Sequence, residues 1–463
     1  MNLKQLLKGN ARKGFHKELA ALMLPIAVQN LITSAVSMAD VVMVGQLNQT
    51  ALSASSLAGQ VAFVLFFVYY GMASSVTILA AQYWGKGDRR IVGKILGLGL
   101  YISMTVSITA ALLAGFVPGT VMSFWTKDPE LIETGARYLR FVALSYLFSG
   151  LTQPYIAVMR SCERVKFSMV LSMVTLSLNV VLNAVLIFGL LGFPAMGIEG
   201  AALATTISRG VELLICLVDF TRQKVLPRSI GNILRVPRSL LQDFRKFALP
   251  AFLNDVMWGF AYNMNSVIMG HLGSDMVAAN SLVTVVRDLV TTVGFGISSA
   301  AAIMLGKELG QNQAETARQD AGSLIRVTLL CSVVSGALLL ILTPFIPGLA
   351  KVSEVSAGYM RFMLLMNVPY QAGMLINTLL IAAVLRCGGD TKYGMVIDIS
   401  TMWGWAVPVG LLTAFVFKLP PLIVYVFMCT DEFVKMPFAV HRYRSGKWLQ
   451  NITREHPEEG QEP

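Results

Sequence analysis

The stretch Leu24–Gly45, LPIAVQNLITSAVSMADVVMVG, decides the fold because it occurs twice in this chain of 463 residues. Shifting the numbering by 225 brings it onto Leu249–Gly270, LPAFLNDVMWGFAYNMNSVIMG. The same shift holds without a gap as far as Gly85 and Gly310, and it keeps Leu-Pro, Ser-Leu and several glycines in register. An offset that persists over such a length indicates an internal repeat and not merely a shared apolar composition.

The composition is that of a membrane protein, with 55% hydrophobic and only 14% charged residues. Ordinary soluble domains contain about 25% charged residues. A helix needs ~20 mostly apolar residues to cross a bilayer. The first apolar run is a full span that belongs to the repeat, so we do not expect a removable signal peptide. The sequence predicts twelve spans, at 20–44, 52–80, 95–117, 133–157, 167–190, 197–220, 247–269, 278–305, 323–349, 358–385, 394–417 and 420–440.

Lys and Arg are distributed very unequally between alternate loops. The loops on one side contain 27 of them, and those on the other contain only 3, namely Lys127, Lys351 and Lys418. Cytoplasmic loops carry the excess of positive charge, so we expect a multi-pass protein of the plasma membrane with both termini in the cytoplasm. The net charge of +11 is then a topology signal, and no nucleic-acid partner is expected.

Six spans in each half bring both halves into the membrane from the same side. The predicted fold is therefore an all-α integral membrane protein, with twelve transmembrane helices in two six-helix lobes related by a parallel pseudo-two-fold repeat and a substrate path between them. The predicted domains are an N-terminal lobe at 1–220, a basic cytoplasmic linker at 221–246, a C-terminal lobe at 247–440 and a cytoplasmic tail at 441–463.

Enzymatic and metal-binding motifs are not apparent. The five cysteines contain no CxxC pair, which predicts free thiols and neither a disulfide framework nor a metal site. The four histidines fall in predicted loops and tails, and no nucleophile–base spacing is present. We therefore predict that the protein is not an enzyme.

Polar residues inside the spans are the candidates for function. Asp40 is the only acid in the first span, and its counterpart in the second copy is Asn265. A carboxylate within a span usually faces a cavity or a partner; the alternative is that Asp40 lies at the membrane interface. Asn179 and Asn183 share one face of the fifth span at a spacing of four residues. Packing between helices is the alternative for this pair.

Several motifs in order resemble the multidrug and toxic compound extrusion (MATE) family over nearly the whole chain. They are DVVMVGQL at 40–47, QYWGKGD at 82–88, NVVLNAVLIFG at 179–189, GHLG at 270–273 and LRCGGDTK at 385–392. The resemblance implies two six-helix lobes that export cationic amphipathic drugs or metabolites by alternating access, in exchange for protons or sodium ions. No other cofactor is implied.

The resemblance also implies site residues. Members of the DinF type carry a coupling aspartate at the place of Asp40 and an Asn-x-x-x-Asp motif whose second position is Asn183 here. We therefore expect Asp40, Asn179 and Asn183 to form the cation-coupling site. NorM-type members keep acids in the seventh and tenth helices, but the tenth span here has none. The further candidates for a substrate or second-lobe site are Thr205, Asp255, Gln371 and Asp398.

One alternative function is a flippase of lipid-linked saccharides, since the wider superfamily shares the two-lobe plan. Such a carrier would favour a basic cavity, for which five arginines lie near spans: Arg137, Arg140, Arg209, Arg287 and Arg361. The expected partners are a small-molecule substrate and the lipid bilayer, and we expect a monomer. The sequence does not identify the substrate or distinguish proton from sodium coupling.

Overall fold

The computed structural model describes residues 12–227, 230–349 and 353–455. These residues form helices, turns and loops, and no strand occurs among them. Ten helices are long and apolar enough to cross a membrane. The predicted all-α membrane class is confirmed.

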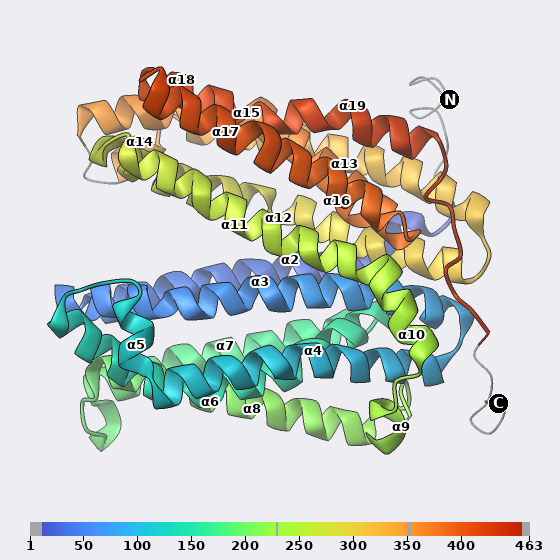
Figure 1. Cartoon of the computed structure of the whole chain (residues 1–463), viewed down its shortest axis with the longest axis horizontal. Helices are drawn as coiled ribbons and strands as arrows, with labels where there is room; N and C mark the ends of the chain where they lie inside the picture. The colour runs from blue at the N-terminus through green and yellow to red at the C-terminus, as the bar shows by residue number, and fades with distance from the viewer. Residues whose placement is uncertain (1–11, 228–229, 350–352, 456–463) are drawn as a thin grey trace. The chain divides into compact units, whose positions relative to one another are not determined.

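Each of the twelve predicted spans falls on a helical segment (Figure 1). In the first half these are α2 (Phe15–Gly45), α3 (Gln49–Lys86), α4 (Arg89–Phe116), α6 (Pro129–Ser161), α7 (Val165–Phe188) and α8 (Gly197–Arg222), with α5 (Pro118–Ser123) as a short connecting helix. Between the halves lie α9 (Ile230–Leu234), α10 (Arg238–Asp243) and the π-helical turn η2 (Phe244–Ala248).

The second half has the same order, with more interruptions. It contains α11 (Leu249–His271), α12 (Ser274–Gly310), α13 (Ala314–Leu342), the short α14 (Ile346–Leu349) and α15 (Glu354–Asn377), which continues as the π-helical η3 (Thr378–Leu385). The next rod runs through α16 (Thr391–Thr401), η4 (Met402–Ala406), α17 (Val407–Leu411) and η5 (Leu412–Val416). The last consists of α18 (Pro421–Met428) and α19 (Asp431–Arg444).

Two predicted spans are not among the ten apolar helices, and their sequences explain why. Helix α11 contains Asn254 and Asp255 as well as two further asparagines. The last span is divided after Met428, and α19 begins with Asp431 and Glu432. Polar groups at such positions lower the mean hydropathy of a helix, so both segments depend on buried partners inside the protein.

Helix ends follow local signals. The Asp88 carboxylate accepts a hydrogen bond from the backbone N–H of Ile91 at the start of α4. Asp128 caps α6 in the same way, with Pro129 at the first helical position. Gly189 ends α7 in the left-handed conformation, which glycine adopts without a steric penalty. Helix α3 has 38 residues, a length of about 57 Å, so it extends well beyond a hydrocarbon core of about 30 Å.

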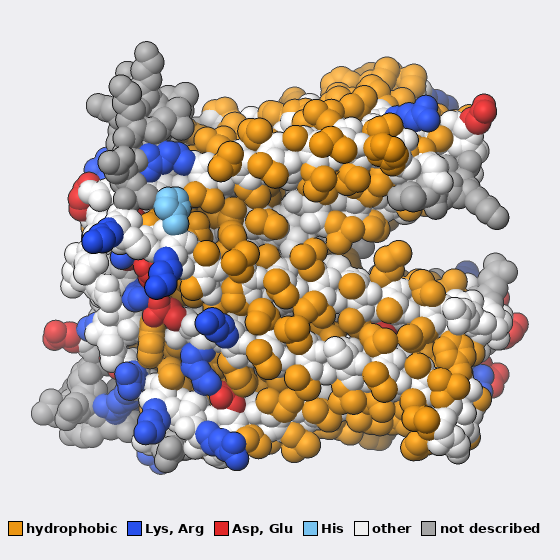
Figure 2. Space-filling view, turned by 180° about the vertical axis from the view of Figure 1, so that it is seen from behind, with side chains coloured by type: hydrophobic (Ala, Val, Ile, Leu, Met, Phe, Trp, Pro, Cys, Tyr) orange, Lys and Arg blue, Asp and Glu red, His pale blue; other side chains and the backbone are white. Residues whose placement is uncertain are grey.

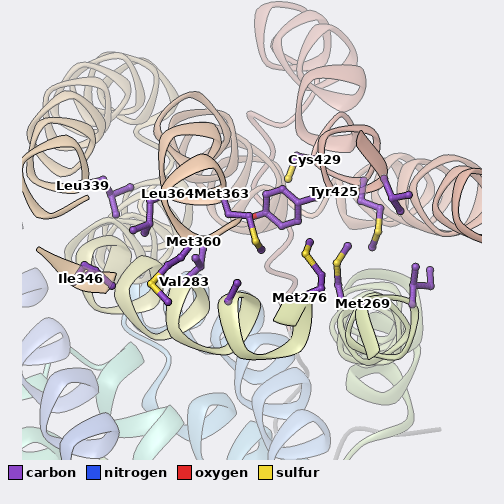
Figure 3. Packing of buried hydrophobic residues seen from close by; sticks show 14 of the residues in the cluster. Met269, Met276, Val283, Leu339, Ile346, Met360, Met363, Leu364, Tyr425 and Cys429 are labelled. Carbon is purple, nitrogen blue, oxygen red and sulfur yellow. The ribbon is translucent and has the colours of Figure 1, made fainter. Parts of the chain in front are cut away.

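The chain forms two compact units. One contains residues up to Ala27, the segment Ala81–Gly87 and the residues from Gln242 onward; the other contains Val28–Ala80 and Asp88–Leu241. The first of these units has a methionine-rich core between α11, α12, α15 and α18 (Figure 3), in which Met269, Met276 and Met360 are almost fully buried. The predicted domain boundaries stay predictions.

Large apolar side chains cover the outer flanks of the helices. Figure 2 shows hydrophobic side chains over most of the visible helical surface, with Lys and Arg gathered toward the helix ends. Val333 and Val334 on α13 are each more than 60% exposed. Exposed apolar flanks of this extent are typical of helices that face lipid.

Candidate functional site

Asp40 meets Asn183 in the first half of the chain. Asp40 is half-buried on α2, and the Nδ2 of Asn183 on α7 donates a hydrogen bond of 2.6 Å to its Oδ1. The Asn183 side chain is only 2% exposed. An amide at this position orients the carboxylate without neutralising it, so the negative charge stays available to a cation.

The other predicted first-half residues continue this contact. Asn183 Nδ2 also lies 3.4 Å from Asn179 Oδ1, and Asn179 Nδ2 lies 3.4 Å from the Thr205 hydroxyl on α8. The Thr205 hydroxyl donates in turn to the Ala201 carbonyl at 3.1 Å. The structure therefore brings Asp40, Asn183, Asn179 and Thr205 together in one chain of polar groups. Asn179 and Asn183 are four residues apart on α7, and this spacing predicts from the sequence that their side chains share one face.

Two neighbours of Asp40 were not predicted. Tyr138 on α6 and Arg209 on α8 both interact electrostatically with its carboxylate. Arg209 also pairs with Glu212 at 2.6 Å, and Glu212 accepts a hydrogen bond from Thr152 at 2.7 Å. The positive charge of Arg209, next to Asp40, is thus already balanced by another acid, Glu212.

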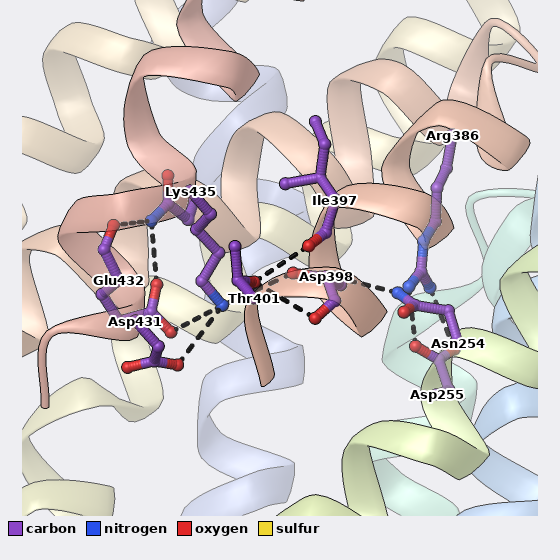
Figure 4. A network of polar contacts seen from close by, with 10 residues as sticks. Asn254, Asp255, Arg386, Ile397, Asp398, Thr401, Asp431, Glu432 and Lys435 are labelled. Atoms are coloured by element: carbon purple, nitrogen blue, oxygen red, sulfur yellow. Dashed lines mark hydrogen bonds and ion pairs between the residues drawn. The ribbon is translucent and has the colours of Figure 1, made fainter. Parts of the chain in front are cut away.

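Asp255 lies in a buried ion pair. Its two carboxylate oxygens accept hydrogen bonds of 2.7 and 2.9 Å from the Arg386 guanidinium (Figure 4). The side chains of Arg386 and Asp255 are 5% and 8% exposed. This bidentate geometry is the strongest form of carboxylate–arginine contact. Among the predicted site residues, Asp255 is therefore the one whose carboxylate is fully engaged in a structural ion pair.

Asp398 belongs to a network that the sequence reasoning missed. It accepts a hydrogen bond from Asn254 at 2.9 Å and lies 3.4 Å from the Lys435 ammonium (Figure 4). Lys435 also contacts Glu432 and Asp431 on its own helix, α19. The signal was present, because an Asp-Glu pair followed by Lys at helical spacing within an apolar span predicts mutual contact.

Gln371 is placed apart from these acids. It is fully buried on α15, where its Oε1 accepts from the Ser335 hydroxyl at 2.9 Å and its Nε2 donates to the Ser332 carbonyl at 2.7 Å. Both partners lie on α13. Its hydrogen-bonding groups therefore hold two helices together, as is common for amides in membrane proteins.

Equivalent positions of the repeat are linked in both halves. In the first half, Arg160 donates to Gln29, and Gln29 Nε2 donates to the Ser172 hydroxyl at 2.6 Å. A shift of 225 places Gln29 on Asn254 and Asn30 on Asp255, and a shift of 226 later in the halves places Arg160 on Arg386 and Ser172 on Asp398. Two acids in the second half thus stand where the first half has neutral residues.

No group of three or more His, Cys, Asp or Glu residues in the described part of the chain is arranged to hold a metal ion. The five cysteines are free thiols, as predicted, and four of them are buried. Burial raises the pKa of the Cys162 thiol, in the connection between α6 and α7, to about 12. A thiol of this kind stays protonated and poorly nucleophilic at neutral pH.

Repeated helical halves with lipid-facing flanks and charged groups buried inside each half define a multi-pass membrane transporter. The MatE family model matches residues 25–185 and residues 250–412, and the two matches begin 225 residues apart. The chain belongs to the MATE family. Members of this family are transporters and not enzymes, and the double match confirms the predicted repeat.

Similar proteins cover almost the whole chain. The transporter YisQ of Bacillus subtilis is 20% identical over 448 residues, which is 96% of this chain and 97% of that protein. The multidrug resistance protein PmpM of Pseudomonas aeruginosa is 24% identical over 396 residues, covering 85% and 83%. The bent form of the Vibrio cholerae MATE transporter VcmN has a TM-score of 0.83 at 18% identity, covering 95% and 98%. MATE transporters of known structure have 12 helices in two lobes, so the predicted fold is confirmed.

Proposed function

We propose that the protein exports cationic amphipathic small molecules in exchange for protons or sodium ions, with Asp40 as the coupling residue. The observation that carries the proposal is the contact of a half-buried carboxylate with the Asn183 amide inside a membrane-spanning helix. Relatives named as multidrug resistance proteins support the substrate class. An isolated carboxylate is the simplest group that attracts an organic cation and a coupling ion to the same place.

The two cations compete for one charge. With a proton or sodium ion on Asp40, the carboxylate is neutralised and an organic cation loses its partner. With the coupling ion released, the carboxylate attracts the cationic substrate. Asn183 and Asn179 remain neutral throughout and supply hydrogen bonds that keep the carboxylate in position. Exchange at one acid couples the two fluxes without any covalent step, and no further cofactor is required.

The charge pairs in the structure favour this function over a flippase of lipid-linked saccharides. Arg209 pairs with Glu212, and Arg287 pairs with Asp288 at 3.0 Å. A carrier of anionic lipid headgroups would need several uncompensated arginines inside its cavity. The proposal also includes a plasma-membrane location, cytoplasmic termini and a working monomer, with the lipid bilayer and the small-molecule substrate as the only partners.

The test is transport by purified protein in proteoliposomes. A fluorescent organic cation is supplied under an imposed pH gradient and, separately, under a sodium gradient. The expected result is gradient-driven transport that Asp40→Asn abolishes, because an amide neither binds a proton nor balances a cation. Asp128→Asn is the matched control, since Asn caps a helix as well as Asp does. Normal transport by Asp40→Asn would overturn the assignment of Asp40.

A further inference from the structure

Four carboxylates surround two cations inside the second half. The ammonium of Lys435, which is 3% exposed, lies 2.9 Å from Glu432, 3.4 Å from Asp398 and 3.9 Å from Asp431. Asn254 joins this cluster to the Asp255–Arg386 pair by donating to Asp398 (Figure 4). The residues come from α11, α16, α19 and the residue that follows η3, so the network spans the interior of the half.

The charges of this network do not cancel. Asp255 and Arg386 neutralise one another in their bidentate contact. Lys435 can balance only one of the three remaining carboxylates, so full ionisation would leave two negative charges in excess. Each of the three acids is 9% exposed or less. Uncompensated charge is strongly unfavourable in such surroundings. One bound proton would reduce the excess to a single negative charge, shared by Asp398 and Glu432 around Lys435.

Asp431 is the carboxylate without a side-chain amide donor. Asp398 accepts from the Asn254 amide, and Glu432 accepts from the Asn377 amide at 2.8 Å. By contrast, Asp431 Oδ1 is buried without a hydrogen-bond partner, and Asp431 is the acid farthest from the ammonium. Asn377 Oδ1, on the amide that contacts Glu432, is likewise buried and without a partner. Of the three acids around Lys435, Asp431 is thus the one whose negative charge is least compensated.

Other titratable groups near Asp431 do not supply the positive charge that would balance its carboxylate. Tyr370 on α15 and Cys429 at the end of α18 interact electrostatically with Asp431, but neither carries a positive charge. Arg287 on α12 is engaged with Asp288. The amino-terminal turn of α19 favours negative charge, yet it already holds both Asp431 and Glu432. The excess negative charge therefore lies on the acids of α19 and α16.

The repeat shows that the fold does not require an acid at the position of Asp398. That position is Ser172 in the first half, where a neutral contact between Gln29 and Ser172 links the equivalent pair of helices, α2 and α7. Burying an acid within a membrane protein is unfavourable in free energy, so its presence there indicates a functional site. The described residues contain no acid cluster with metal-binding geometry, which favours the proton over a metal ion.

We propose that Asp431 carries an exchangeable proton, so that the network around Lys435 is a second proton site, separate from Asp40. Water delivers the proton to Oδ1 and receives it back, with no change in covalent bonding elsewhere. With Asp431 protonated, Asp398 and Glu432 share Lys435, and each keeps one amide donor. Only the role of this proton in transport rests on the proposed antiport; its presence does not.

Infrared difference spectroscopy of the purified full-length protein tests the proposal directly. In the Asp40→Asn background, a pH titration should show the carbonyl stretch of a protonated carboxyl at neutral pH. Adding Asp431→Asn should lower that band by the intensity of about one carboxyl, whereas adding Glu354→Gln, at an exposed acid on α15, should leave it unchanged. Absence of the band before Asp431 is changed, or an undiminished band afterwards, would overturn the proposal. So would its loss on adding sodium at constant pH.

A second variant keeps the test valid if Asp431→Asn does not fold. Lys435→Gln removes the ammonium, so the carboxyl band should grow by the intensity of about one further carboxyl. An unchanged band would overturn the proposal. A transport assay separates the coupling role of Asp40 from the proton on Asp431. Gradient-driven export by Asp40→Asn would contradict the coupling role of Asp40, and it would not affect the infrared prediction for Asp431.

Discussion

Replacing Asp255 with Asn should destabilise the second half of the protein. The change leaves the Arg386 guanidinium, with a side chain only 5% exposed, without its bidentate carboxylate. Breaking a buried ion pair by removing one partner costs about 3–5 kcal/mol, because the remaining charge is desolvated and uncompensated. Asn retains the volume of Asp, so lost packing contributes little. The loss should therefore be almost entirely electrostatic.

The assay is thermal unfolding of purified protein in detergent. For a folding unit of about 150–250 residues, 1 kcal/mol corresponds to a shift in Tm of about 2–4 °C, so Asp255→Asn should lower Tm by about 6–20 °C. The double change of Asp255→Leu and Arg386→Met replaces both charges with apolar groups of similar size. It should recover most of the loss, because no uncompensated charge remains.

Arg160 provides the comparison within the same molecule. It occupies the position of Arg386 in the repeat, but its guanidinium contacts the neutral Gln29 and Ser168. Arg160→Met should therefore shift Tm much less than Asp255→Asn does. Unfolding of Asp255→Asn at the wild-type temperature, or a double variant that is less stable than the single one, would refute the electrostatic reasoning.

Three further outcomes are expected. Gly85→Ala should destabilise the protein by about 1–3 kcal/mol or more, since an added Cβ would lie 2.1 Å from the Lys307 carbonyl oxygen, whereas Gly59→Ala has open space and should show no drop in Tm from a clash. The Cys162 thiol should resist maleimide in folded protein at pH 7 to 8 and react only after unfolding, because its raised pKa of about 12 keeps the thiolate scarce until the pH is far higher; rapid labelling of the native protein would contradict this. A cysteine introduced at position 127 should react with an impermeant reagent from outside intact cells, and one at position 228 should not; the opposite pattern would invert the predicted topology.

Local spacing and the family resemblance together predicted which first-half polar residues lie close to one another; their role stays a prediction. Asn179 and Asn183 project from one face of α7, and that face meets both Asp40 and Thr205. The offset of 225 likewise predicted that the second half repeats the helix order of the first, because a repeat constrains every helix at once. Both inferences use contacts that helix periodicity or repetition determines.

The partners of the second-half acids could not be predicted in this way. Asp255 and Arg386 are 131 residues apart, and nothing in their local sequences specifies that their helices bring them together. The contact of Lys435 with Asp398 also joins two helices, although its contact with Glu432 follows from a spacing of three residues. The sequence predicted the span at 420–440 but not the partner of Lys435 on α16, which only the tertiary packing brings into contact.

The π-helical segment η3 controls which way Arg386 points. Such a segment accommodates an extra residue within an otherwise regular helix, and each residue added to a helix turns everything after it by about 100°. Arg386 follows η3 directly, so deleting one residue from η3 would swing the guanidinium away from Asp255 while leaving the helix intact. A single insertion or deletion can thus make or break a buried charge pair without any change in the charged residues themselves.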